Sequence, residues 1–392
     1  MRKISLAIIG LSLVIIGGVF LATPPKKESF AVSAPHSKIG LYKLKENGLA
    51  LETNDSEKLV PNLDNPNNGN KTPELTTKIE NLIHPKEFNG TLLVIKNGKV
   101  LLNKGYGYAN KETNQLNTFQ SLYYIGSIEK SITATAIMKL VDEGKIKLTD
   151  PIKKYYPTIN DTGVITVKQL LTHTSGIVGM KKTGQQVTHN GAVQEVLDQL
   201  KIVNNGHWHY TDDDYTLLAG IVERASGTDY TTYVTKNIIE KANLSHTGFY
   251  DSFDTALFHT VAYQKVGNQA YQPLPITKGS LSEEFGAGNM YMTAGDLVKF
   301  NQALVDGKLI SQTSLDQMQT PGSSESSYGF GMYLGEKTKY SHGVLGGYHS
   351  LILISKDGND GVVVMANEKT PFDILQTAGA ILKEADKVKT ID

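Results

Sequence analysis

The chain has 392 residues, 40% of them apolar, which is enough for one large globular unit or two smaller ones. Its 39 basic and 39 acidic residues balance, so electrostatics give no reason to expect a nucleic acid as partner. The chain contains no cysteine. Disulfides, thiolate nucleophiles, zinc–thiolate sites and a lipidated cysteine are therefore excluded.

The N-terminus has the features of an export segment. Arg2 and Lys3 precede an uncharged run of 19 residues, 4–22, rich in Ile, Leu and Val. A run of about 20 apolar residues matches the thickness of a bilayer, whereas the core of a signal peptide usually has about 7–15. The basic residues would stay on the cytoplasmic side, which places the rest of the chain outside. We expect residues 1–22 to be a signal or membrane anchor; small residues at 32–34 leave cleavage open.

Residues 23–74 predict a flexible linker. They lack sustained apolar periodicity, and the stretch 62–70 consists mainly of Asn, Asp, Gly and Pro. Such a composition buries too little apolar surface to offset the entropy of the chain. The ordered unit is therefore expected at residues 75–392.

The ordered part begins and ends with strand patterns. Two β-type runs flank Asn97-Gly98, which is a strong hairpin signal. Strands are also expected at 346–354 and 362–365. A final helix is predicted from Thr370, as N-cap, to about Ala385.

Between these strands the patterns are mainly helical. Residues 127–143 predict a mostly buried helix that ends at Gly144, and about 145–290 alternates helical patterns with polar loops. Strands at both ends with helices between them predict an α+β fold, with an antiparallel sheet flanked by helices and an inserted, mainly helical subdomain at about 145–290.

The first chemical motif is Ser127-x-x-Lys130. Residues three apart share one face of a helix, so the hydroxyl and the ammonium lie side by side. In a desolvated site the lysine loses its preference for the charged form and can accept the proton of the serine. Two fixed residues of common types make a weak signal, and a surface serine and lysine would be the simpler interpretation of this motif alone.

The run LLTHTSG at residues 170–176 follows about 40 residues later. Together with Ser127 and Lys130 it resembles the serine β-lactamase-related, penicillin-binding-protein-like family of the class C type, which includes β-lactamases, D,D-peptidases and several esterases. The resemblance implies a β-lactamase/transpeptidase-like fold and extends over about 75–385. It also implies that His173 is structural, so a separate pairing of Ser175 with His173 is not favoured.

Tyr210-Thr211-Asp212 resembles the Y-x-N loop of that family, in which the tyrosine moves a proton between the serine and the leaving group. The resemblance assigns this role to Tyr210. Asp212 departs from the pattern, because a carboxylate replaces the usual amide; it is a possible catalytic or positioning residue that would stabilise the charge of Lys130. A metal site formed by the histidines and aspartates around Tyr210 is the rival interpretation, but their spacing fits no strong ligand motif and the aspartates are expected to cap a helix and face water.

The family also has a strand that closes the site, with K-T-G or H-x-G. Lys182-Thr183-Gly184 matches the letters but lies before Tyr210, so we interpret it as a chance match. The expected substrate and oxyanion strand is at 341–350, with four candidate residues that let the backbone approach an acyl group. These are His342, Gly343, Gly346 and Gly347.

The resemblance implies a serine hydrolase that works through an acyl-enzyme and needs no metal or cofactor. Without K-T-G, and with Asp212, an anchor for a carboxylate is missing, which favours esters. The chain is similar to the teichoic acid D-alanine esterases, methicillin-resistance factors of Gram-positive bacteria. The expected substrate is a cell-envelope polymer, teichoic acid or peptidoglycan, met outside the cytoplasmic membrane or in the cell wall. A D,D-carboxypeptidase or weak β-lactamase, and a non-catalytic cell-wall-binding module, are the alternatives.

Overall fold

The computed structural model describes residues 73–159, 165–179, 181–267 and 271–387. The expected anchor at 1–22, and all of the expected linker except its last two residues, lie outside these ranges. Within the described ranges, no helix is both long enough and apolar enough to cross a membrane.

Helices and strands alternate irregularly along the described chain. The helices are α1 (Pro73–Ile83), η2 (Gly126–Ile128), α2 (Glu129–Asp142), η3 (Ile152–Lys154), α3 (Val167–Leu171), α4 (His189–Asp198), α5 (Asp212–Ser226), α6 (Tyr230–Val234), η4 (Thr235–Ile239), α7 (Tyr250–Phe253), α8 (Lys278–Ser282), α9 (Ala294–Val305), α10 (Gln312–Met318) and α11 (Ile374–Ala385). The strands are β1 (Gly90–Lys96), β2 (Lys99–Tyr106), β3 (Tyr108–Asn110), β4 (Gln115–Leu116), β5 (Tyr123–Tyr124), β6 (Gly248–Phe249), β7 (Tyr263–Lys265), β8 (Tyr271–Pro273), β9 (Met290–Met292), β10 (Tyr333–Leu334), β11 (Thr338–Leu345), β12 (Tyr348–Ser355) and β13 (Gly361–Ala366).

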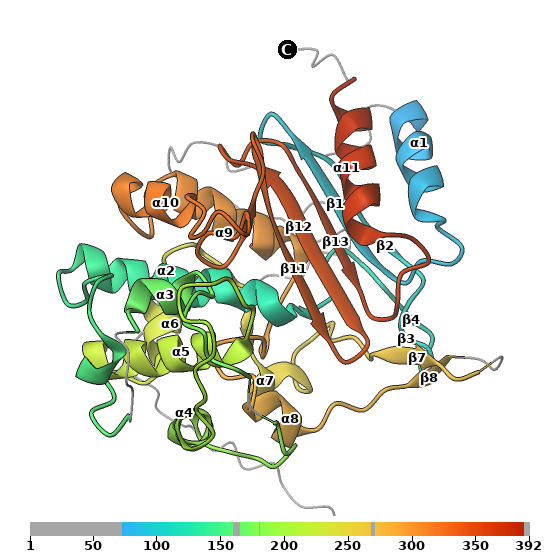
Figure 1. The fold of residues 1–392 in the computed structure, drawn as a ribbon. Helices are drawn as coiled ribbons and strands as arrows, with labels where there is room; N and C mark the ends of the chain where they lie inside the picture. The colour runs from blue at the N-terminus through green and yellow to red at the C-terminus, as the bar shows by residue number, and fades with distance from the viewer. Residues whose placement is uncertain (1–72, 160–164, 180, 268–270, 388–392) are drawn as a thin grey trace, which may run out of the picture. The chain divides into compact units, whose positions relative to one another are not determined.

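The main sheet is built from both ends of the ordered chain. Its six strands have the order β10-β11-β12-β13-β1-β2, and every neighbouring pair is antiparallel. Strand β1 therefore pairs with β13, although more than 250 residues separate them. Helices α1 and α11 cover one face, and α2, α9 and α10 lie on the other (Figure 1). The expected α+β fold, with an antiparallel sheet flanked by helices, is confirmed.

Successive side chains of the central strands point to opposite faces of the sheet, so the apolar side chains are divided between two cores. In β1, Leu93 and Ile95 belong to the large core on the α2 side, whereas Leu92 and Val94 belong to the smaller core under α1 and α11. Because helices cover both faces, the strand is apolar at nearly every position, as the sequence run 90–95 shows.

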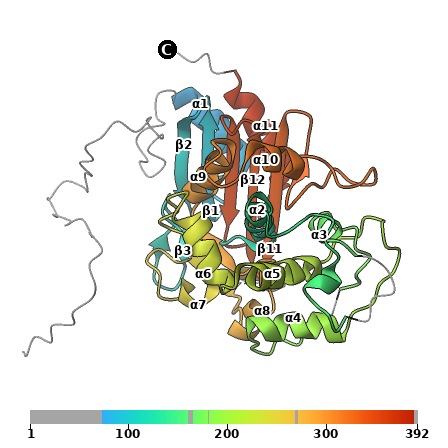
Figure 2. The same cartoon turned by 90° about the vertical axis from the view of Figure 1, so that its left-hand side faces the viewer.

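Helix α2 positions the chemical groups. It is buried on almost all sides, and its preceding turn η2 lies against β11. Helix α2 packs against α5 (Figure 2). Its first turn is thus held between the sheet and the helical part of the chain. A residue at this point can be reached by side chains from both.

The two local predictions had different outcomes. The hairpin around Asn97-Gly98 is confirmed as the turn between β1 and β2. The N-cap of the last helix was wrong: Asp373, not Thr370, accepts from the amide of Gln376 at 2.8 Å, and α11 starts at Ile374. Both residues are good caps, and the helix starts at the one from which Ile374, Ala378 and Ile381 reach the sheet.

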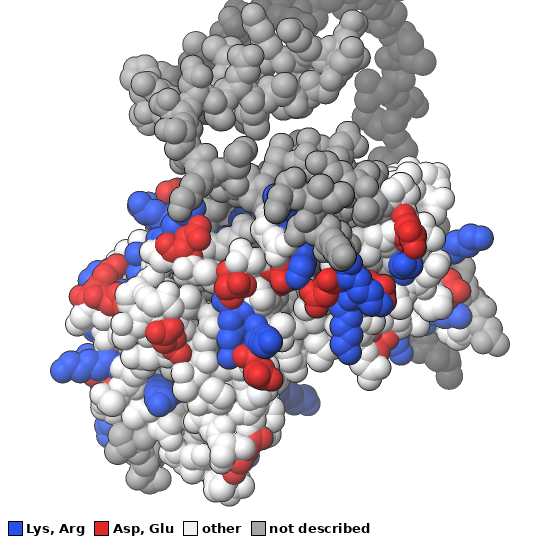
Figure 3. Space-filling view, turned by 90° about the horizontal axis from the view of Figure 1, so that it is seen from above, with Lys and Arg blue, Asp and Glu red and all other residues white. Residues whose placement is uncertain are grey.

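On the face shown in Figure 3, basic and acidic side chains are interspersed and do not gather by sign. This arrangement agrees with the balanced composition of the whole chain. It offers no extended positive surface there for a polyanion such as a nucleic acid.

Candidate active site

Ser127 and Lys130 meet as their spacing predicts. Ser127 lies in the turn η2, directly before α2, and Lys130 lies in the first turn of that helix. The Lys130 ammonium donates to Ser127 Oγ at 3.0 Å, and the side chain of Lys130 is fully buried. The serine hydroxyl is thus held beside an ammonium that is shielded from bulk water.

Tyr210 completes the group around the serine oxygen. Its hydroxyl donates to Ser127 Oγ at 2.8 Å. Tyr210 comes from the loop before α5, and its ring packs on His173 with centroids 4.4 Å apart. The three expected catalytic side chains therefore converge, and Ser127 Oγ accepts hydrogen bonds from two of them, an arrangement that stabilises negative charge on this oxygen.

Asp212 pairs with Lys130. It is the first residue of α5, after the N-cap Thr211, where the helix dipole favours an anion. Lys130 Nζ donates to Asp212 Oδ1 at 2.7 Å and to the carbonyl of Ala287 at 2.8 Å. Burial alone would lower the pKa of Lys130, but the charge of Asp212 and the nearby Tyr210 outweigh it, so the pKa lies above its usual value. Lys130 is therefore charged at rest.

The aspartates after Thr211 start a helix, as expected, but the second and third of them do not face water. Asp214 is fully buried and Asp213 is 4% exposed. Burial would raise the pKa of Asp212, yet Lys130 and Lys182 outweigh it and hold this pKa well below its usual range. The expectation that these aspartates face water was therefore wrong for Asp213 and Asp214, which are buried in the first turn of α5.

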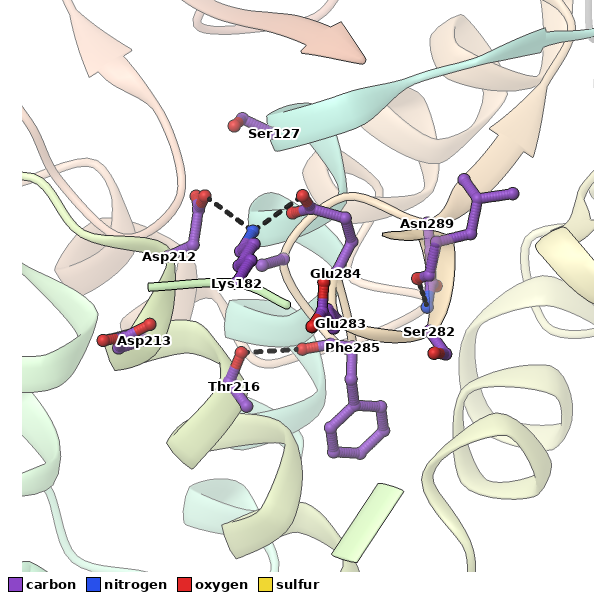
Figure 4. A network of polar contacts seen from close by, with 12 residues as sticks. Ser127, Lys182, Asp212, Asp213, Thr216, Ser282, Glu283, Glu284, Phe285 and Asn289 are labelled. Carbon is purple, nitrogen blue, oxygen red and sulfur yellow. Dashed lines mark hydrogen bonds and ion pairs between the residues drawn. The ribbon is translucent and has the colours of Figure 1, made fainter. Parts of the chain in front are cut away.

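Lys182 is the residue that the sequence analysis missed. Its ammonium lies 3.3 Å from Asp212 Oδ2 and 2.6 Å from Glu284 Oε1 (Figure 4). The K-T-G letters at 182–184 are not on a strand of the site, so rejecting them as the family's strand motif is consistent with the fold. Treating Lys182 as unrelated to the site was wrong. The signal in the sequence was Asp212 itself, because a carboxylate in place of the family's amide indicates a second cation nearby.

Gly343 brings β11 against the nucleophile. A Cβ on Gly343 would lie 1.8 Å from the carbonyl oxygen of Ile125 and 2.9 Å from the amide nitrogen of Ser127. A Cβ on Gly126, whose φ is 50°, would lie 2.8 Å from the amide nitrogen of Val344. Only glycine fits at these two positions, and the amides of Ser127 and Val344 lie on either side of this contact.

The other residues expected on this strand lie elsewhere. Gly346 and Gly347 form the turn between β11 and β12. A Cβ on Gly346 would meet Ile276, just before α8, and one on Gly347 would meet the backbone of Tyr263, at the start of β7, so neither packs on Ser127. His342 does lie at the site, where it lines the cavity beside the nucleophile.

A cavity of about 290 Å³ opens beside Ser127 and Tyr210. Three further tyrosines line it, so its walls are apolar rings that carry hydroxyl groups. No Lys or Arg is among the described residues that line it. The further tyrosines are Tyr328, Tyr333 and Tyr340.

His173 holds the loop that carries Tyr210 in place. Its Nδ1 lies 3.0 Å from Asp214 Oδ2, and Ser175 Oγ donates to Asp214 Oδ1 at 2.6 Å. Its carbonyl accepts from the amide of His209 at 2.8 Å, which fixes the loop that carries Tyr210. Burial lowers the pKa of His173 well below its usual value, so the ring is neutral. Ser175 and His173 thus meet through a buried carboxylate, which makes them a structural group.

Several residues of the rival metal interpretation have other partners. Asp212 is taken by two ammonium groups, Asp214 by Ser175 and His173, and His207 pairs with Glu325 at 2.7 Å. Within the described ranges, the side chains that come close enough to share an ion are a different group. They are His189, Glu223 and Asp229.

Residues 79–386 of the chain match the protein-family model described as Beta-lactamase. This chain belongs to the beta-lactamase family. The relationship agrees with the arrangement of Ser127, Lys130 and Tyr210 around one oxygen atom.

The relatives of this chain among curated proteins include the following two. "Putative penicillin-binding protein PbpX" of Bacillus subtilis (strain 168) is 37% identical over 298 residues, which cover 76% of this chain and 75% of that protein. A teichoic acid D-alanine hydrolase of Staphylococcus aureus is 30% identical over 275 residues, 69% of this chain and 67% of that protein. The crystal structure of FmtA from S. aureus superposes with a TM-score of 0.71 at 26% identity, covering 84% of this chain and 90% of that one.

Proposed function

We propose that this protein is an exported serine esterase that removes D-alanine from teichoic acids through an acyl-enzyme. The observation that carries the chemistry is the pair of hydrogen bonds from Lys130 and Tyr210 to Ser127 Oγ. Support for the substrate comes from the relative named as a teichoic acid D-alanine hydrolase.

The proposed reaction has two halves. Ser127 Oγ attacks the ester carbonyl, and the amides of Ser127 and Val344 donate to the oxyanion. The proton of Ser127 passes to Lys130 after the Lys130–Asp212 pair has lost a proton. Tyr210 then gives its own proton to the alcohol that leaves and takes the proton from Lys130 in its place. Water then attacks the acyl-serine, which releases D-alanine and restores the hydroxyl.

The charges around the cavity favour an ester over a substrate with a free carboxylate. The two ammonium groups near Ser127 are both paired with Asp212. The described lining of the cavity offers no further Lys or Arg to bind a carboxylate. A D-alanyl ester of a polyol needs no such cation, and the hydroxyls of the tyrosines suit a hydroxylated leaving group.

The proposed location is the outer face of the cytoplasmic membrane or the cell wall. Its support is the basic and then apolar order of residues 2–22. Fractionation of cells that express the full chain, with and without residues 4–22, tests it. Recovery of the full chain only in the cytoplasm would refute export.

Release of D-alanine is the test of the substrate. The chain should release D-alanine from D-alanylated teichoic acid, Ser127→Ala should release none, and Ser245→Ala, an exposed serine, should match the parent. A folded parent that releases no D-alanine refutes the substrate.

The relative at 37% identity carries the name of a penicillin-binding protein, which makes penicillin recognition the second candidate. Labelling by a fluorescent penicillin with measurable turnover would favour a D,D-carboxypeptidase or weak β-lactamase. No reaction with any serine-directed phosphonate would favour a non-catalytic wall-binding module.

A further inference from the structure

Lys182 links the catalytic pair to a second carboxylate. One oxygen of Asp212 accepts from Lys130 at 2.7 Å, and the other lies 3.3 Å from Lys182 Nζ. The same ammonium lies 2.6 Å from Glu284 Oε1. Figure 4 shows Lys182 between the two carboxylates, with Ser127 nearby. Four charges thus alternate in sign from Lys130 to Glu284.

The loop that carries Lys182 is fixed in place. The neighbouring carboxylate, Glu283, is buried and accepts from the amide of Thr183 at 2.7 Å, from its hydroxyl at 2.8 Å and from the amide of Gly184 at 2.9 Å. Lys182 itself is only 28% exposed. Two successive glutamates after α8 therefore hold one loop, one by its backbone and one by its ammonium group.

This arrangement addresses the departure at position 212. A carboxylate beside Lys130 favours the charged ammonium, which cannot accept the proton of Ser127. When the Lys130–Asp212 pair loses its proton, its net charge changes from zero to minus one. A positive charge nearby favours that change, whichever of the two residues carries the remaining proton.

We propose that Lys182 is a positioning residue: it holds Asp212 and adds the positive charge that favours loss of the proton which Lys130 carries at rest. Glu284 has the opposite sign and orients Lys182. This inference rests on the proposed acyl-enzyme chemistry of Ser127, but not on the identity of the ester.

Other titratable groups surround the Lys130–Asp212 pair and stay unchanged in the test. Burial raises the pKa of Glu129 to about 7, so this group titrates in the same range in parent and variant alike. The remaining groups come from α5 and the loop before it, from the loop after α3 and from β10. They are Tyr210, Asp214, Tyr215, His173 and Tyr333.

The test is the pH profile of the reaction of Ser127 with a fluorophosphonate, which needs no teichoic acid. Two unit charges about 6 Å apart at an effective dielectric constant of about 20 shift a titration by about one to two pH units. Lys182→Met should move the acidic midpoint of the rate upward by about that amount, so that the rate well below the midpoint falls about tenfold or more. Lys182→Arg should leave the midpoint near that of the parent.

Two further variants separate charge from structure. Glu284→Gln should move the midpoint downward, and the double variant with Lys182→Met should return it toward the parent, because the two lost charges are opposite. Lys181→Met, an exposed lysine of the same loop, should leave it unchanged. Thermal unfolding checks that each variant is folded; if Lys182→Met is not, the shift in Glu284→Gln decides.

An unmoved midpoint in folded Lys182→Met, or an equal shift in Lys181→Met, would overturn the role of Lys182. A parent that reacts with the phosphonate but releases no D-alanine would overturn the substrate alone. The two failures are therefore distinguishable.

Discussion

Replacing Asp212 by asparagine is the most informative single change at this site. The amide keeps the shape and an acceptor for Lys130, but it removes the negative charge that lies 2.7 Å from Lys130 Nζ. Lys130 would keep its contacts with Ser127 Oγ and the Ala287 carbonyl. Burial lowers the pKa of Lys130, and without the charge of Asp212 this effect would be opposed less, so the pKa of Lys130 would fall.

The size of the effect follows from the geometry. Two opposite unit charges about 4 Å apart interact by about 4 kcal/mol at an effective dielectric constant of about 20. Asp212 is 34% exposed, and solvent screening reduces this to about 2 kcal/mol, which corresponds to about 1.5 pKa units. The acidic midpoint of phosphonate labelling in Asp212→Asn should fall by about this amount.

Asp212→Asn should also lower the stability of the fold at neutral pH. The depressed pKa of Asp212 stabilises the fold above pH 3.8, and this contribution is lost as the pH falls through the folded pKa. Asp212→Asn should therefore be less stable than the parent at pH 7 by about 2 kcal/mol in denaturant unfolding, with a smaller difference in strong acid. The control Asp251→Asn removes an exposed carboxylate and should change neither quantity. A midpoint that stays in place or rises in Asp212→Asn would refute this electrostatic reasoning.

Three further changes test the surroundings. Burial lowers the pKa of Lys339 to about 8, and among the described residues its ammonium has no hydrogen-bond partner. Lys339→Met should therefore stabilise the fold by about 3 kcal/mol at pH 7, as measured by chemical unfolding. This gain should vanish between about pH 8 and pH 10.5, where the lysine of the unfolded chain also loses its proton. Gly343→Ala should reduce phosphonate labelling about a hundredfold or more, because the new Cβ would lie 1.8 Å from the Ile125 carbonyl oxygen. The control Gly379→Ala, where nothing lies within 4 Å of the new Cβ, should leave the labelling unchanged. Tyr210→Phe should slow turnover of a D-alanyl ester about 10²–10⁴-fold, with unchanged unfolding, because the proton donor to the leaving alcohol is lost; unimpaired turnover would remove Tyr210 from the mechanism.

The part of the site that lies in the continuous helical stretch of η2 and α2 could be predicted from the sequence. Ser127 and Lys130 are three residues apart, so helical geometry alone places them together. Tyr210 came from a resemblance to a family, because no local pattern says that residue 210 will reach residue 127. The six-stranded sheet was foreseeable as an α+β fold, but the pairing of β1 with β13 is a long-range contact that alternation does not specify.

Three of the errors have a common physical cause. Lys182, the aspartates of α5 and the glycines of the β11–β12 turn all depend on contacts between segments far apart in the sequence. Lys182 looked like a chance match because its partners, Asp212 and Glu284, lie 30 and more than 100 residues away. A charge that breaks a family pattern, as Asp212 does, is the best local sign that such a distant partner exists.

The most direct test of the proposed function is to trap the acyl-enzyme. The chain is mixed with a D-alanyl ester of glycerol, quenched in acid during turnover, digested and examined by mass spectrometry. One D-alanyl group should be found on the peptide that contains Ser127, and it should be absent from Ser127→Ala. Turnover without any adduct on the parent, or an adduct on another residue, would contradict the nucleophile that the geometry assigns.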